Sequence, residues 1–132
     1  MKKIIAITAF LLANLVWAEW PHSNISQAVF ARSVADRAPL GIISEAENSL
    51  KKVYFFTNIR HLSGEKITHR WSYKGKVKAE ISFEIGSKRW RVWSSKNLWH
   101  NWTGDWKVEV LNRAGDILLS KKFSYKKAGE NE

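Results

Sequence analysis

The residues best suited to chemistry form a short basic and aromatic run in the second half of the chain. Arg89, Arg91 and Trp93 alternate along this run, and Lys96 follows them. Guanidinium groups can donate paired hydrogen bonds to phosphate or carboxylate groups, and an indole ring adds an apolar face. The run therefore predicts a surface that binds a ligand carrying both a negative charge and a sugar or aromatic ring. The alternative is that Trp93 packs under a loop and the arginines form surface ion pairs of little energetic value.

Two further residues extend this candidate surface. Trp99 stands in the loop of residues 97–102, which combines tryptophans with amide and imidazole groups, a combination suited to sugars. Arg70 falls on the same outer face as the basic run in the strand register predicted below. The candidate ligand-binding residues are therefore Arg89, Arg91, Trp93, Lys96, Trp99 and Arg70.

The chain shows no motif that predicts catalysis. Ser94 and Ser95 lie near His100, but neither serine is in a nucleophile-elbow motif. Glu80 and Glu84 alternate onto a solvated face, where cross-strand ion pairs are the simpler role. The four histidines have no spacing typical of metal ligands, and the chain has no cysteine. We expect a protein that is not an enzyme and that holds no metal and no cofactor.

The first 18 residues are predicted to be a cleavable signal peptide. Lys2 and Lys3 precede an apolar run, and a Val-Trp-Ala cleavage sequence ends at Ala18. The apolar run is about thirteen residues long, whereas a membrane-spanning helix needs about twenty. No cysteine that could be acylated follows it. We therefore expect residues 19–132 to be released as a periplasmic or secreted protein without a transmembrane span.

The predicted mature part is one basic domain. The chain has 22 lysines and arginines and 12 acidic residues, and only two of these charges, Lys2 and Lys3, lie before residue 19, so the formal charge of the rest is +8. Its length suits a single core, which we place at about residues 27–125. Without cysteine, the fold must rest on apolar burial. Nucleic acid is not an expected partner, because the chain has no recognition motif.

Short alternating runs separated by turn residues predict an all-β fold. In the clearest run, from Val77 to Ile85, apolar residues alternate with lysine, glutamate and serine. Turn signals at Gly86-Ser87 and at Gly75 join this run to its neighbours and predict a three-stranded meander. Its strands are residues 66–72, 77–85 and 88–95. The register places Trp71 opposite Val77 and Phe83 opposite Trp90, with Trp71, Trp90 and His69 on the inner face.

Four further strands complete the prediction, at residues 27–34, 53–59, 106–111 and 117–125. The stretch from 36 to 49 has no periodicity and is predicted to be a crossover connection. About seven antiparallel strands in roughly a hundred residues indicate a small two-sheet sandwich of immunoglobulin-like type. A small β-barrel is the alternative fold.

Several segments resemble one bacterial protein family. They are ARSVADRAPLG at 31–41, VYFFTNIR at 53–60, THRW at 68–71, YKGKV at 73–77, RWRVWSSKNL at 89–98 and WTGDWKVEV at 102–110. In this order they resemble the "domain of unknown function 2914" (DUF2914) family, and the resemblance covers about residues 27–125. It implies a compact β-domain of an envelope or exported protein. It implies no catalytic residue, because the family has no assigned chemistry.

Two functions remain open at this stage. In the first, the protein is a non-catalytic envelope module whose surface binds an anionic or glycan ligand, such as peptidoglycan or lipopolysaccharide. In the second, it is an accessory domain that docks on another envelope protein, with Arg91 and Trp93 as anchors of a small interface.

Overall fold

A computed structural model describes residues 19–129 of the chain. The predicted signal peptide, residues 1–18, lies outside the described residues. Among residues 19–129, no helix is both long and apolar enough to cross a bilayer.

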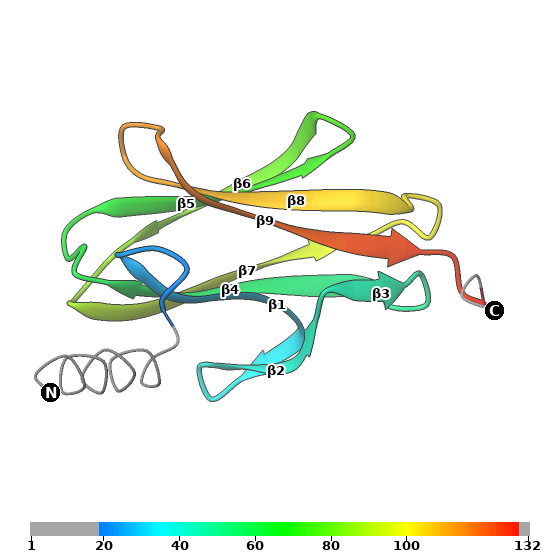
Figure 1. Cartoon of the computed structure of the whole chain (residues 1–132), viewed down its shortest axis with the longest axis horizontal. Helices are drawn as coiled ribbons and strands as arrows, with labels where there is room; N and C mark the ends of the chain where they lie inside the picture. Colours follow the sequence, from blue (N-terminus) through cyan, green and yellow to red (C-terminus); the bar gives the residue numbers. More distant parts are fainter. Residues whose placement is uncertain (1–18, 130–132) are drawn as a thin grey trace, which may run out of the picture.

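The described chain is an all-β sandwich of two sheets (Figure 1). Its nine strands are β1 (Ile25–Ala35), β2 (Ala38–Ile43), β3 (Glu45–Glu47), β4 (Lys52–Arg60), β5 (Lys66–Tyr73), β6 (Lys76–Glu84), β7 (Arg89–Asn97), β8 (Gly104–Leu111) and β9 (Ile117–Lys126). One sheet has the order β2-β1-β4-β7 and the other the order β3-β9-β8-β5-β6. The arrangement β1-β4-β7 against β9-β8-β5-β6 is that of an immunoglobulin-like sandwich. The prediction of a sandwich is confirmed, and the sheets do not close into a barrel.

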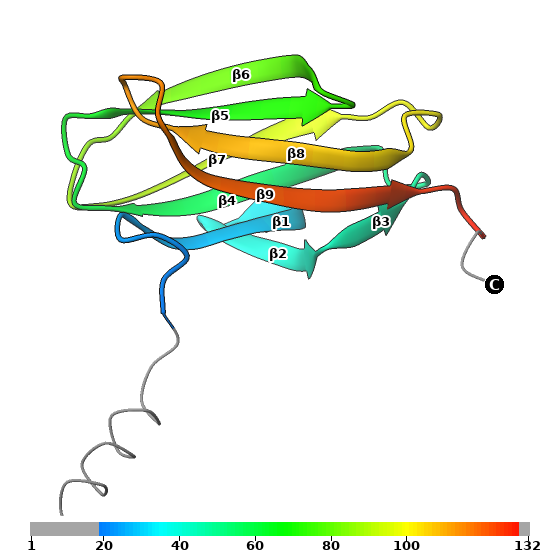
Figure 2. The ribbon, with the colours of Figure 1, turned by 45° about the horizontal axis from the view of Figure 1, so that its top comes forward.

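The two sheets lie face to face (Figure 2), and their inner faces meet in one aromatic core. Alternation along β4 and β5 turns Phe55, His69 and Trp71 inward, and none of the three is exposed to solvent. Phe30 from β1 contacts both Phe55 and Trp71, with ring centres 4.9 and 6.1 Å away. These contacts join the sheets without any disulfide, because the chain has no cysteine.

The stretch from 36 to 49 is not a plain connection, and that prediction is wrong. Asp36 and Arg37 both have positive φ angles, of 52° and 59°, and form a two-residue turn from β1 into β2. The short strand β3 then pairs in parallel with β9. β2 could not be recognised from the sequence, because this strand contains Pro39 and Gly41 and has no alternating pattern. It lies at a sheet edge, where proline is tolerated.

The predicted meander is correct for its first hairpin only. β5 pairs with β6, but Trp71 lies opposite Ala79 and not opposite Val77. The turn consists of Lys74 and Gly75 alone, both with positive φ. This turn displaces the predicted register by one residue, and a β-bulge between Trp71 and Ser72 displaces it by one more. Because the total displacement is two residues, the predicted inner face is unchanged.

The second hairpin of the meander does not form, because β7 pairs with β4 in the other sheet. Ile85 is hydrogen-bonded to the 64–65 loop through both its N–H and its carbonyl group, so the chain leaves the five-stranded sheet there. Trp90 is therefore opposite Ile59 and not opposite Phe83. Matching apolar residues across two strands cannot tell a hairpin from a crossing between sheets, since both bury the same face.

The hairpin of β1 and β2 folds over the outer face of the four-stranded sheet. β1 and β7 are not neighbours in this sheet, because β4 lies between them. Even so, Arg91 of β7 donates a hydrogen bond of 3.3 Å to the carbonyl of Arg37 at the hairpin tip. In Figure 1 the tip points toward the end of the molecule at which β7 begins. The hairpin thus brings Arg37 to residues more than fifty positions later in the chain.

Candidate functional site

A cationic hollow lies where the hairpin tip meets the first half of β7. Its volume is about 380 Å³, and its lining residues are Arg37, Ser87, Arg89, Trp90, Arg91 and Trp93. Three separate segments build it: the β1–β2 turn, the link between β6 and β7, and β7 itself. We call this site the cationic hollow. It contains three of the predicted binding residues, namely Arg89, Arg91 and Trp93.

Within residues 19–129, the arginines of the cationic hollow have no carboxylate partner. Five ion pairs are found among residues 19–129, and none involves Arg37, Arg89 or Arg91. In addition, Arg60 of β4 lies directly opposite Arg89 of β7, and like charges in that position destabilise a sheet. The outer face of this sheet end therefore carries an uncompensated positive charge.

Two tryptophans flank these guanidinium groups. Trp93 is stacked on Phe56, with ring centres 6.2 Å apart and planes 16° apart, and 36% of its surface is exposed. Trp90 packs over Gly86, where a Cβ atom would come within 2.8 Å of its ring. It stays 39% exposed at the end of the sandwich, so the prediction that it belongs to the buried core is wrong. Both rings are held in place and present apolar surface to the hollow.

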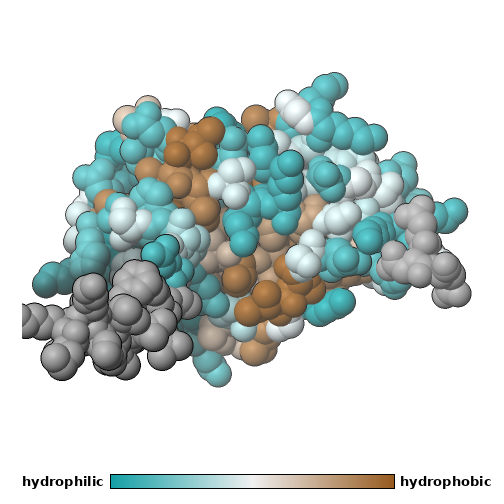
Figure 3. Space-filling view, viewed as in Figure 1, coloured by the Kyte–Doolittle hydropathy of each residue, from teal (hydrophilic) through white to brown (hydrophobic). Residues whose placement is uncertain are grey.

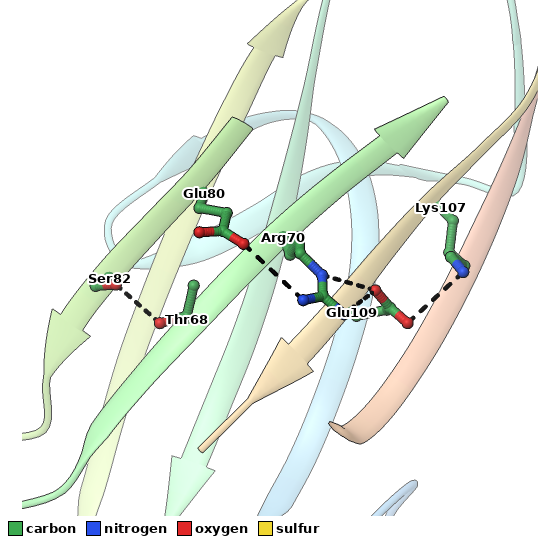
Figure 4. A network of polar contacts seen from close by, with 6 residues as sticks. All are labelled: Thr68, Arg70, Glu80, Ser82, Lys107 and Glu109. Atoms are coloured by element: carbon green, nitrogen blue, oxygen red, sulfur yellow. Dashed lines mark hydrogen bonds and ion pairs between the residues drawn. The ribbon is translucent and has the colours of Figure 1, made fainter. Parts of the chain in front are cut away.

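Arg70 does not belong to this surface, because β5 and β7 lie in different sheets. Its Nη2 and Nε atoms lie 2.8 and 2.9 Å from one carboxylate oxygen of Glu109 (Figure 4). Glu80 lies on its other side at 4.0 Å, and Lys107 contacts Glu109 at 3.6 Å. The guanidinium group is thus neutralised within the outer face of the five-stranded sheet. The predicted shared face was wrong because it assumed that β6 and β7 form a hairpin.

Lys96 and Trp99 lie together at the other end of β7. Lys96 is opposite the buried Val53, so it alternates onto the face opposite to Trp93. Its Nζ atom lies 5.6 Å from the ring centre of Trp102, a residue of the loop after β7. Trp99 is 64% exposed beside that ring. The six predicted residues therefore separate into three places: the cationic hollow, this end of β7, and the ion-pair network of Arg70.

Ser94, for which the sequence predicts no role as a nucleophile beside His100, is paired with the buried His69. Ser94 Oγ lies 2.8 Å from His69 Nδ1 and accepts a hydrogen bond of 3.0 Å from the indole of Trp71. The other ring nitrogen of His69 lies 3.0 Å from Thr57 Oγ1. Burial lowers the pKa of His69 to about 3. Because His69 is fully enclosed by the core, these bonds connect the two sheets and face no ligand.

Sequence reasoning missed Arg37, Ser87 and Trp90 as members of the hollow. Arg37 comes from a distant turn, and only the folded hairpin brings it to β7. Trp90 was assigned to the core by alternation, which does not reveal that a strand end protrudes from the sandwich. Among residues 19–129, no group of His, Cys, Asp or Glu side chains has the arrangement of a metal site.

The fold and this surface together define an immunoglobulin-like sandwich domain with one strongly cationic sheet end. Residues 64–125 match the model of the family described as "Protein of unknown function (DUF2914)", so this part of the chain is a DUF2914 domain. The matched segment includes β5, β6, β7, β8 and nearly all of β9. It begins later than the predicted resemblance, which started at residue 27. A search of curated proteins found no match to the chain.

Proposed function

We propose that this protein is a non-catalytic, exported binding module of the cell envelope, and that the cationic hollow takes an anionic ligand. The observation that carries the proposal is the convergence of Arg37, Arg89 and Arg91 on one hollow with no carboxylate partner among the described residues. Folding brings like charges together there, and a bound anion would compensate them. The signal-peptide pattern of residues 1–18 supports export.

The composition of the hollow narrows the ligand to an anionic sugar. Guanidinium forks fit phosphate or carboxylate oxygens. The exposed indole faces of Trp90 and Trp93 suit the apolar face of a sugar ring that carries such a group. Lipopolysaccharide and peptidoglycan both offer anionic sugars of this kind, so they are the ligands to test first.

The proposal is tested by measuring how much purified protein sediments with peptidoglycan and how tightly it binds lipopolysaccharide. Arg89→Gln combined with Arg91→Gln should weaken binding to one of these polymers at least tenfold. Lys51→Gln combined with Lys127→Gln removes the same charge from exposed positions and should leave binding nearly unchanged. Equal losses in the two double variants would mean that net charge alone carries binding. No binding of the wild-type protein to either polymer would reject this function.

A second function, docking on another envelope protein, is favoured by one separate observation. Leu40 and Ile42 on the edge strand β2 are 51% and 59% exposed, and Figure 3 shows apolar surface over this strand. Edge strands with exposed apolar side chains are common sites of protein contact. Salt separates the two functions, because binding through several charges weakens steeply with salt and an apolar contact does so much less.

A further inference from the structure

A second hollow lies at the far end of β7, away from the cationic hollow. It has a volume of about 340 Å³ and is lined by Lys96, Asn97, Leu98, Trp99 and Trp102. Lys78 from β6 lies next to one of these lining residues, with its Nζ atom 5.5 Å from the ring centre of Trp102. We call these six residues the lysine–tryptophan site.

Both sheets contribute to this site. β6 is an edge strand of the five-stranded sheet and β7 is an edge strand of the four-stranded sheet. One lysine from each strand lies near the indole ring of Trp102. The Nζ atom is 5.5 Å from the ring centre for Lys78 and 5.6 Å for Lys96. Neither lysine takes part in an ion pair with another residue between 19 and 129. The indole ring partly compensates the two ammonium groups, and their remaining charge faces solvent.

The two tryptophans differ in how firmly they are held. Trp102 packs against Trp106, with ring centres 5.9 Å apart, and its carbonyl accepts a hydrogen bond of 3.0 Å from the Trp106 indole. Trp99 meets Trp102 at an interplanar angle of 71° and is 64% exposed. The site therefore has one anchored ring that positions the cations and one exposed ring that is free to stack on a ligand.

We propose that the lysine–tryptophan site binds an acidic saccharide, that is, a sugar ring bearing a carboxylate. The exposed face of Trp99 would stack on the ring, and Asn97 supplies an amide for its hydroxyl groups. The ammonium groups of Lys78 and Lys96 would receive the carboxylate as point charges. This inference goes beyond the proposed function, because it concerns separate residues and does not depend on the cationic hollow.

The test uses a galacturonic acid trisaccharide and its methyl ester, which has the same sugar rings without the charges. The full protein is titrated with each, and binding is followed by calorimetry and by the indole N–H signals in NMR spectra. The acid should bind at least tenfold more tightly than the ester, and the signal of Trp99 should shift. Equal binding of the two saccharides, or no binding of the acid, would overturn the proposal.

Variants then assign the binding to particular residues. Trp99→Ala should abolish binding of the acid, and the ring is exposed enough for its removal to leave the fold intact. Lys78→Gln combined with Lys96→Gln should reduce the affinity for the acid to that for the ester. The matched control, Lys51→Gln with Lys127→Gln, removes two exposed charges that lie in neither hollow and should bind the acid as the wild type does. An equal loss in that control would mean that net charge alone carries binding, and normal binding by Trp99→Ala would exclude the lysine–tryptophan site.

Discussion

The two faces of β7 differ in how their polar groups are satisfied. On the inner face, Val92 and Ser94 are buried, and Ser94 is hydrogen-bonded to both His69 and Trp71 of the opposite sheet. On the outer face, Arg89 and Trp93 are exposed, and the arginines there have no ion-pair partner among the described residues. A buried polar group that is hydrogen-bonded inside the fold contributes to stability, whereas an exposed charged group without an ion-pair partner is hydrated and available to a ligand.

The inner hydrogen bonds fix the protonation of His69. Thr57 Oγ1 donates to the carbonyl of Val92 at 3.3 Å, so it must accept from His69 Nε2–H. His69 Nδ1 is then an acceptor for the hydroxyl of Ser94, which itself accepts from Trp71. Each hydrogen is used once, and the described residues contain no buried side-chain polar atom without a partner. This chain of bonds requires a neutral imidazole.

The largest effect expected from breaking the inner face is that of Trp71→Ala. Trp71 is fully buried, and removing a buried tryptophan costs about 3–5 kcal/mol of unfolding free energy. Trp90→Ala should cost only roughly 1–2 kcal/mol of unfolding free energy, since the ring of Trp90 keeps much of its contact with water in the folded protein. Urea denaturation of both variants measures the difference. An equal cost for the two would contradict the placement of Trp90 at an exposed strand end.

The second largest effect on the inner face should be that of acid, which lowers the free energy of unfolding through His69. The His69 ring is enclosed by Phe55 and Phe83, and its pKa is about 3 in the folded protein against 6.5 in the unfolded chain. Between these values only the unfolded chain binds the proton, so the free energy of unfolding should fall by about 2 kcal/mol between pH 7 and pH 5. Denaturation at a series of pH values measures it. His69→Gln, which cannot titrate, should lose that part of the pH dependence.

The inner face was largely predictable from the sequence, and the outer surface was not. Alternation placed His69 and Trp71 inward, and a displacement of β5 against β6 by two residues left both on that face. Alternation also turned Arg89, Arg91 and Trp93 to one side correctly. It could not show which sheet β7 joins, and so it assigned Arg70 to a surface that it does not share. Nor could it bring Arg37 to the hollow, since that contact depends on how a hairpin folds over a sheet.

The smallest expected effects compare a paired arginine with an unpaired one. Arg70→Gln should cost about 1–2 kcal/mol of unfolding free energy, because it leaves the buried carboxylate of Glu109 with only Lys107 nearby. Arg89→Glu should instead stabilise the protein by roughly 0.2–1 kcal/mol, because it places opposite charges across β4 and β7 in the position of the Arg60–Arg89 pair. Urea denaturation at low salt measures both.

High salt provides the control for Arg89→Glu, since the gain from a cross-strand ion pair at the surface should shrink as salt screens it. The same variant should also lose binding to the anionic polymer tested with the cationic hollow, because it reverses a charge that the ligand is proposed to contact. Greater stability together with weaker binding would show that the repulsion between Arg60 and Arg89 lowers stability and that the charge of Arg89 is needed to bind the ligand. If Arg89→Glu destabilised the protein as much as Arg70→Gln, then Arg89 would have a structural partner, and the contrast between the two arginines would fail.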